Sequence, residues 1–367
     1  MSYRLAAACL AAVIALGAAF GASASHTSPA VAAPGSPGQV VSMDPRPSGG
    51  FTMKYRSTGV DGSVVEESAV VWFPTGPRSG AVVAWAHQTV GIADVCAPSF
   101  RDDVTVPGLD HLLAAGDVVV APDYEGLGTA GVHPYLVGAS EGRSVLDAIR
   151  AARITAGVSG PSAAFGWSQG GHAVLFAGKL APLYAPDVQL TGVAALAPVT
   201  SVTSLVDGTS PLSRVPGVVA MVAAGYLAAY PHLNPSDVLT EPATQLEAAR
   251  NVCDPATALA STTTRGPSPS WTASLAENDV AASSIAVPVL LAQGTDDYLL
   301  PIGQSIHAGE RLCSEGSTVQ LVRYPRIGHD SVPAASKNDV LRWLDDRLAG
   351  RPAGACGMWD GIPETSS

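Results

Sequence analysis

Short, nearly unbroken apolar runs alternate along the chain with segments whose apolar residues recur at helical spacing. Residues 81–86, 117–122 and 190–197 are largely apolar, as is typical of strands buried on both faces. Between the second and third runs, residues 143–156 place apolar side chains three to four positions apart, which predicts a helix. This alternation predicts an α/β fold with a mainly parallel sheet and helices on both faces.

The alternation stops between residues 200 and 284, where Ser, Thr, Pro and Ala are abundant. One long apolar stretch, 215–230, is shorter than the roughly 20 residues of a membrane span, and Pro216-Gly217 interrupts its start. We interpret residues 200–284 as a helical cap or lid inserted into the sheet domain, in preference to a second independent domain. The sheet pattern resumes at residue 285.

The N-terminal residues 1–24 match the pattern of a secretory signal peptide. Arg4 is followed by an apolar run and by Ala22-Ser23-Ala24, a small-x-small cleavage site. A membrane anchor is the alternative, but the apolar run is too short for one. We therefore expect a secreted protein with a flexible lead-in at 25–47, a core at 48–199 and 285–358, and a tail at 359–367.

Composition excludes several classes of protein. Charged residues make up 14% of the chain and hydrophobic ones 47%, so the chain is globular and not disordered. The net charge of -11 and the absence of a basic cluster argue against a nucleic-acid partner. The string at 126–131 fits G-x-G-x-x-G, but Val132-His133-Pro134 follows where a dinucleotide site needs a helix, so we expect no cofactor.

Four cysteines remain after the signal peptide: Cys96, Cys253, Cys313 and Cys356. An even number in an exported chain favours two disulfides, and spacing alone leaves three pairings open. The sequence contains no C-x-x-C or H-E-x-x-H motif, so we expect no metal site.

The hexapeptide Gly166-Trp167-Ser168-Gln169-Gly170-Gly171 lies between a predicted strand and a predicted helix. Strand, G-x-S-x-G and helix together form the pattern of a nucleophile elbow. Glycines two positions either side of the serine avoid collisions at a sharp turn. Ser168 is therefore the candidate nucleophile, and the backbone N–H of Gln169 is a candidate oxyanion donor.

A serine nucleophile needs a histidine base, which in turn needs a carboxylate. Asp297 follows the strand at 285–292 and has a proline four residues later, as in G-x-x-D-x-x-x-P, so we prefer it to its neighbour Asp296. His329 follows Gly328 after the last predicted strand, 318–324, and is the candidate base. His172 is expected to pack or bond locally.

A second oxyanion donor should come from the loop after the strand at 81–86, which reads His87-Gln88-Thr89-Val90-Gly91. The position matches the HGGG-type loop of esterases, although Gln88 replaces a glycine. We choose Thr89 over Gln88 as this donor.

With these motifs the chain resembles the secretory lipase family of α/β-hydrolases from about residue 81 to 357. The resemblance also rests on segments at 96–99, 122–126, 135–138 and 144–152, of which 122–126 and 144–152 are more particular to that family. It implies an α/β-hydrolase fold and a carboxylester hydrolase acting on acylglycerols or similar esters. It further implies the pairings Cys96–Cys253 and Cys313–Cys356.

The leading hypothesis is therefore a secreted serine esterase or lipase with catalytic residues Ser168, Asp297 and His329. Its partners would be a small-molecule or lipid ester and, transiently, a lipid interface; the sequence does not predict an oligomeric state. An acyltransferase that uses the same residues, with an alcohol in place of water, is the alternative enzyme. A lipid-binding protein without turnover is the alternative outside enzymes.

Overall fold

The computed structural model describes residues 35–254 and 264–361. The expected signal peptide at 1–24 lies outside these ranges, as do the start of the lead-in and the end of the tail.

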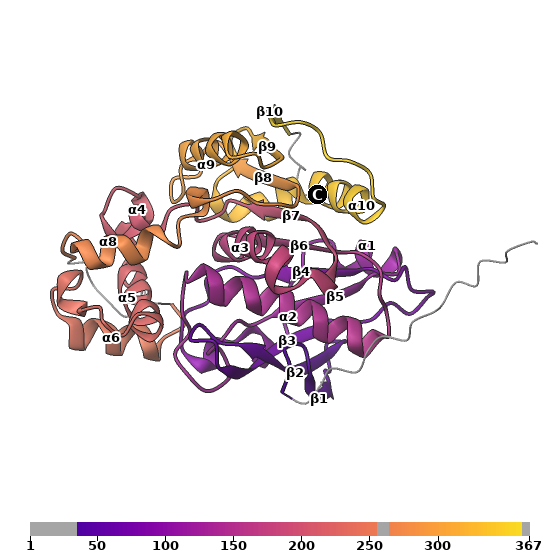
Figure 1. Cartoon of the computed structure of the whole chain (residues 1–367), viewed down its shortest axis with the longest axis horizontal. Coiled ribbons are helices and arrows are strands. Elements are labelled where there is room, and N and C mark those ends of the chain that lie inside the picture. Colours follow the sequence, from indigo (N-terminus) through magenta and orange to yellow (C-terminus); the bar gives the residue numbers. More distant parts are fainter. Residues whose placement is uncertain (1–34, 255–263, 362–367) are drawn as a thin grey trace, which may run out of the picture.

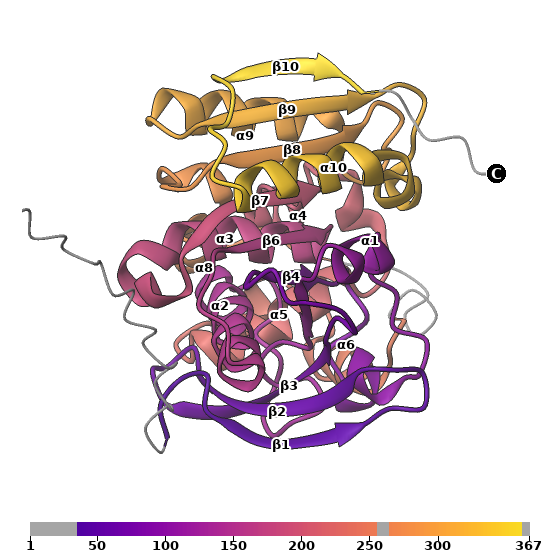
Figure 2. The same ribbon diagram turned by 90° about the vertical axis from the view of Figure 1, so that its right-hand side faces the viewer.

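The described residues form one ten-stranded sheet with the order β1-β2-β3-β5-β4-β6-β7-β8-β9-β10 (Figure 1). Figure 2 shows the strands stacked from β1 at the bottom to β10 at the top. The pairs β1–β2, β2–β3 and β3–β5 are antiparallel. Every pair further along the sheet, from β5–β4 to β9–β10, is parallel. The predicted mainly parallel α/β fold is confirmed. The strands are β1 (Val40–Pro45), β2 (Phe51–Thr58), β3 (Val64–Trp72), β4 (Val82–Ala86), β5 (Val118–Pro122), β6 (Ser162–Trp167), β7 (Leu190–Leu196), β8 (Val289–Gly294), β9 (Val319–Tyr324) and β10 (Gly357–Asp360).

Both outer strands differ from the expectations drawn from the sequence. β1 lies within the segment expected to be a flexible lead-in, and β10 extends into the expected tail. Each forms its ladder with one neighbour, β2 or β9. Such edge strands bury little apolar surface, so they leave only a weak hydrophobic pattern in the sequence.

Helices cover both faces of the sheet. α2 (Gly138–Ala156), α3 (Gln169–Tyr184) and α9 (Ile302–Ser314) contribute side chains to a core on one face. α1 (Leu109–Ala114) and α10 (Val332–Leu348) pack against the other face, around Val83 and Trp85. Neighbouring residues of the central strands point alternately into these two cores, which explains why the strands are apolar throughout.

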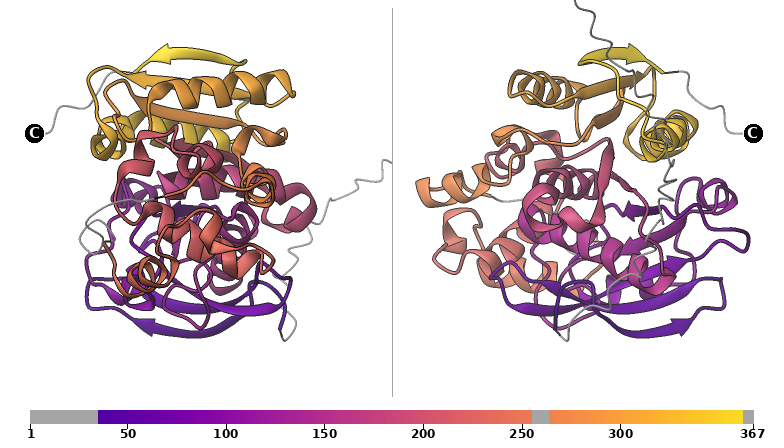
Figure 3. Two further views of the ribbon diagram at one scale, coloured as in Figure 1. Left: turned by 90° about the vertical axis from the view of Figure 1, so that its left-hand side faces the viewer. Right: turned by 45° about the vertical axis from the view of Figure 1, so that its right-hand side comes forward.

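Between β7 and β8, the described residues 200–254 and 264–284 form a helical insertion on one side of the sheet (Figure 1). It contains α4 (Val202–Val206), α5 (Val218–Ala229), α6 (Pro242–Asn251) and α8 (Pro269–Ala276). Their apolar side chains form a separate core together with Tyr135, Leu136 and Leu300 of the sheet domain. Figure 3 shows these helices on the opposite side of the sheet from α10.

The long apolar stretch of the sequence is α5, whose residues 218–226 are buried. They pack within the core of the insertion, which explains a helix that is hydrophobic on all sides. A β-carbon on Gly225 would lie 2.4 Å from the backbone nitrogen of Tyr135, so α5 approaches that loop closely. Across residues 35–254 and 264–361, no helix combines the length and apolar character needed to cross a membrane.

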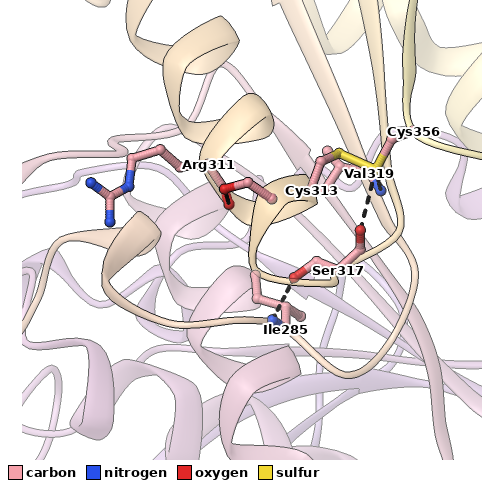
Figure 4. Close-up of a disulfide and its surroundings, with 7 residues drawn as sticks. Ile285, Arg311, Cys313, Ser317, Val319 and Cys356 are labelled. Atoms are coloured by element: carbon pink, nitrogen blue, oxygen red, sulfur yellow. Dashed lines mark hydrogen bonds between the residues drawn. A yellow bond between two sulfur atoms is a disulfide. The ribbon is translucent and has the colours of Figure 1, made fainter.

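Two disulfides occur, with the pairing implied by the family resemblance. Cys96–Cys253 joins the loop after β4 to the helical insertion. Cys313–Cys356 joins the end of α9 to the segment before β10 (Figure 4). Beside it, the N–H of Val319 donates to Sγ of Cys356, and the N–H of Ile285 donates to Oγ of Ser317. The second disulfide therefore fastens the edge strand to the sheet.

Glu67 on β3 is a carboxyl group with no solvent exposure. The Tyr55 hydroxyl donates to its Oε2 at 2.8 Å, and Oγ of Ser144 lies 2.9 Å from its Oε1. Burial raises the pKa of Glu67 from 4.5 to about 8. The folded chain therefore binds one more proton than the unfolded chain between these values, and the free energy of unfolding falls as pH rises through this window.

We expect Glu67→Gln to flatten this pH dependence, because the amide is neutral at every pH and keeps both hydrogen-bonding positions. Removing the ionisation changes the slope by at most about 1.4 kcal/mol per pH unit, so the variant should be the more stable protein at pH 8. Urea unfolding between pH 5 and 9 measures the slope. Glu66→Gln, a neighbour that forms ion pairs with Lys54 and Arg56, is the matched control. Equal slopes in wild type and Glu67→Gln would contradict the prediction.

Candidate active site

Ser168 stands between the end of β6 and the start of α3, with φ 57° and ψ −112°. A positive φ is unfavourable for a residue with a side chain. It persists only where the surrounding structure enforces it. A β-carbon on Gly166 would lie 2.3 Å from the carbonyl oxygen of Gly170, and one on Gly170 would lie 1.9 Å from that of Ala86. Only glycine fits at both positions, so the G-x-S-x-G pattern is a steric requirement of this turn.

The structure brings Ser168 together with His329 and Asp297. Nε2 of His329 lies 3.1 Å from Oγ of Ser168, and Nδ1 lies 2.8 Å from Oδ2 of Asp297. All three side chains are buried. Since a carboxylate accepts the Nδ1 proton, Nε2 of the neutral ring is free to accept the serine proton.

The surroundings of Asp297 hold its carboxylate in one orientation. Oδ1 accepts the N–H groups of Leu299 and Leu300, at 3.0 and 2.8 Å, and Oδ2 accepts from Nε2 of Gln293 at 2.8 Å. The neighbouring Asp296 is exposed and accepts from the Thr295 hydroxyl. The structure thus places Asp297, and not Asp296, against His329.

In the loop after β4, the backbone carbonyl groups of His87 and Gln88 each form a hydrogen bond with a buried side chain. The Tyr124 hydroxyl donates to the His87 carbonyl at 2.8 Å, and Nδ1 of His87 lies 2.6 Å from the carbonyl oxygen of Gln88. A carbonyl oxygen only accepts, so Nδ1 carries the proton. Burial lowers the pKa of His87 to about 4, so the ring is neutral and Nδ1–H is its one donor.

The His87 ring thereby orients the backbone N–H of Thr89. In a trans peptide the C=O and the following N–H point in opposite directions. Because the Gln88 carbonyl faces the His87 ring, the Thr89 N–H points away from it. Within residues 35–254 and 264–361, the N–H groups of Thr89 and Gln169 have no hydrogen-bond acceptor, so both can donate to a ligand. The Thr89 hydroxyl bonds separately to Tyr135 at 2.8 Å.

Behind the elbow, the fully buried carboxylate of Glu141 joins several segments, a role that the sequence did not indicate. It accepts from the Leu136 N–H at 3.0 Å and from Nε2 of Gln169 at 2.8 Å, and its Oε2 lies 2.7 Å from Nδ1 of His172. Nε2 of His172 lies 2.9 Å from the backbone carbonyl oxygen of Asn278 and donates to it, since a carbonyl oxygen only accepts. The elbow helix is therefore tied to the helical insertion.

The ranges 35–254 and 264–361 hold no cluster of three or more His, Cys, Asp or Glu side chains placed to bind a metal ion.

Comparison with known proteins bears on this site. The model of the family described as Secretory lipase matches residues 102–260 and 269–356. Lipase A of Moesziomyces aphidis is 31% identical over 162 residues, which are 39% of this chain and 33% of that protein. Lipase A of Arthroderma benhamiae is 24% identical over 336 residues, which are 82% of this chain and 71% of that protein.

Another relative carries a different description. A Mycobacterium tuberculosis protein described as a probable inactive lipase is 25% identical over 350 residues, which are 84% of this chain and 75% of that protein. Among solved structures, Candida antarctica lipase A in its closed state is similar with a TM-score of 0.71 and 20% identity, covering 90% of this chain and 86% of that one. This structural likeness shows the shared α/β-hydrolase fold.

Proposed function

The chain belongs to the secretory lipase family, and we propose that it is a secreted serine hydrolase that cleaves acylglycerol-like esters through an acyl-enzyme on Ser168. One observation carries the proposal, the buried chain of hydrogen bonds from Ser168 through His329 to Asp297. The strained turn at Ser168 adds to it, because strain of this kind persists where function requires it. Two disulfides fit an oxidising compartment outside the cell.

The geometry supports a two-step reaction. Nε2 of His329 takes the proton of Ser168 as Oγ attacks the ester carbonyl, and the resulting oxyanion accepts the N–H groups of Gln169 and Thr89. His329 then passes its proton to the leaving alcohol oxygen as the ester C–O bond breaks. Water attacks the acyl-enzyme with His329 again as base, which releases the acid and restores Ser168.

We propose that the helical insertion, residues 200–284, acts as a cap beside this site. The Cys96–Cys253 disulfide ties it to the loop that carries His87 and Thr89. The contact of His172 with Asn278 ties it to the elbow helix. Both attachments end within a few residues of groups assigned to the reaction.

The test of the proposed function is detection of the acyl-enzyme. With p-nitrophenyl esters from acetate to palmitate, we expect turnover preceded by a burst of about one p-nitrophenolate per active site when deacylation is slower than acylation. Rapid acid quenching followed by peptide mass analysis should locate the acyl group on Ser168. Absence of turnover with every ester would refute the proposal. The protein would then match the description of its Mycobacterium tuberculosis relative as a probable inactive lipase. An acyl group on another residue would refute the role of Ser168.

A further prediction concerns the oxyanion hole. His87→Ala removes the donor that holds the Gln88 carbonyl, so the Thr89 N–H loses its fixed direction. Loss of a whole oxyanion donor lowers kcat by about 100- to 1,000-fold, and we expect His87→Ala to lower kcat by about 10- to 100-fold with little change in KM. Steady-state kinetics with p-nitrophenyl butyrate measure both constants.

His111→Ala is the control for this variant, because the exposed His111 on α1 pairs with Asp345 away from the elbow. It should retain the kcat of the wild type. A loss in His87→Ala confined to KM would contradict the role of the His87 ring in orienting a donor to the transition state.

A further inference from the structure

His133 is a fully buried histidine to which the proposed reaction assigns no role. It follows the string at 126–131, whose glycines fit a dinucleotide motif. A β-carbon on Gly126, which has φ 73°, would lie 2.6 Å from the backbone nitrogen of His133, so only glycine lets this loop fold back on itself. Gly225 of α5 approaches the backbone nitrogen of Tyr135 in the same way. Close packing on both sides therefore fixes the backbone of this segment.

The His133 ring is neutral, and its tautomer follows from its contacts. Nδ1 lies 2.9 Å from the carbonyl oxygen of Glu125. A carbonyl oxygen only accepts, so Nδ1 carries the proton. Burial lowers the pKa of His133 and so favours the uncharged ring. Nε2 therefore keeps a lone pair, which accepts a hydrogen bond from Nε2 of Gln169 at 2.8 Å.

The Gln169 side chain is fully buried and held in one orientation. Of the two hydrogens on its amide nitrogen, one is donated to Nε2 of His133 and the other to Oε1 of Glu141, each at 2.8 Å. Rotating the amide by half a turn would place its oxygen against two acceptors, which excludes that orientation. The same residue supplies a backbone N–H that we assign to the oxyanion hole. The side chain therefore anchors this N–H.

The His133 ring also contacts two tyrosines that hold the loop after β4. It stacks on the Tyr124 ring with centroids 5.7 Å apart, and it packs edge-on with the Tyr135 ring at 6.0 Å. The Tyr124 hydroxyl donates to the His87 carbonyl, and the Tyr135 hydroxyl lies 2.8 Å from the Thr89 hydroxyl. Because these contacts fix the planes of both tyrosine rings, they also fix where the two hydroxyl groups lie.

We propose that His133 is a positioning residue that sets the distance between the two oxyanion donors, the N–H groups of Gln169 and Thr89. It acts on Gln169 through its lone pair and on Thr89 through the tyrosines that its ring contacts. The proposal rests on ester hydrolysis at Ser168. Because the donors bind the oxyanion more strongly than the carbonyl of the bound ester, misplacing them lowers kcat and leaves KM nearly unchanged.

The experiment compares p-nitrophenyl butyrate with its thionoester, in which sulfur replaces the carbonyl oxygen. Sulfur accepts hydrogen bonds weakly and forms a longer bond to carbon, so an oxyanion hole discriminates against it. In the wild type, we expect kcat/KM for the ester to exceed that for the thionoester by about 100-fold. His133→Leu removes the lone pair and should lower both kcat for the ester and this ratio by about tenfold.

His133→Gln tests whether the lone pair is what matters. Its amide can place an oxygen toward Gln169 and a nitrogen toward the Glu125 carbonyl, so it can replace both hydrogen bonds of the ring. We expect it to restore kcat and the ratio to within about threefold of the wild type.

Tyr135→Phe tests the contact with Thr89, because it removes only a hydroxyl. It should lower kcat for the ester, and the ratio with it, by about three- to tenfold. The matched control is Tyr226→Phe. It also removes a fully buried hydroxyl beside this segment, but one that donates to the Leu136 carbonyl at 3.3 Å. It should leave kcat and the ratio unchanged.

The ratio separates positioning from folding, because a partly unfolded variant loses activity toward both substrates by the same factor. The inference is overturned if His133→Leu or Tyr135→Phe lowers the two activities equally, if the loss is confined to KM, or if His133→Gln loses as much as His133→Leu. Failure of the proposed function is a distinct result. The wild type would then hydrolyse neither substrate, and both proposals would fall.

Discussion

Ser168→Ala should lower kcat for p-nitrophenyl butyrate by about 10⁴- to 10⁶-fold, since no other group can form the acyl-enzyme. The oxyanion donors and the substrate-binding surface remain, so KM should change little and a small rate above that in water should persist. Alanine, like serine, carries a β-carbon, so the strain at φ 57° is unchanged. The substitution removes the partner of Nε2 of His329, while Nδ1 keeps its bond to Asp297.

Steady-state kinetics and the burst amplitude together measure this effect. Ser336→Ala is the matched control, because Ser336 is also fully buried but donates only to the Val332 carbonyl within α10. It should keep the kcat of the wild type. Turnover in Ser168→Ala within about tenfold of the wild type would exclude the proposed mechanism.

Asp297→Asn should lower kcat by about 10⁴-fold, whereas Asp296→Asn should leave it almost unchanged. The reason is the orientation that the loop imposes. The N–H groups of Leu299 and Leu300 require an oxygen at the Oδ1 position, so the asparagine NH₂ must occupy the Oδ2 position beside His329. There it donates to Nδ1 and places the ring proton on Nε2, which can no longer accept the proton of Ser168.

This pair of substitutions also tests which of the two acids acts. Both remove one charge from the same loop, so the exposed Asp296 controls for the change in charge. Activity is measured with p-nitrophenyl butyrate, and folding is checked by urea unfolding. A larger loss in Asp296→Asn than in Asp297→Asn would reverse the assignment.

Local patterns in the sequence were sufficient for much of the fold. The continuous apolar runs at 81–86 and 190–197 became strands between two helical layers, because a strand buried on both faces has no polar side to display. The turn at Ser168 could also be predicted from a local sequence pattern. Its glycines are required by contacts with residues only a few positions away or with the adjacent strand.

The proline after Asp297 is the reason why the sequence favours this acid over Asp296, because the motif describes the loop that folds around the acid. In the structure, Oδ1 of Asp297 accepts two N–H groups of that loop. By contrast, β1 and β10 gave little sequence signal. Their ladders are made by backbone groups, which every residue possesses.

The sequence by itself determined which residue types stand at the ends of which elements, because periodicity, turn chemistry and steric limits act over a few residues. Only the tertiary structure decided which of those ends meet. Ser168 and His329 lie 161 positions apart, and Glu141 and His172 lie on different helices. The direction of the Thr89 N–H depends on the neutral His87 ring, which is neutral because the fold buries it. Long-range contacts of this kind arise when packing closes the chain, and no local pattern records them.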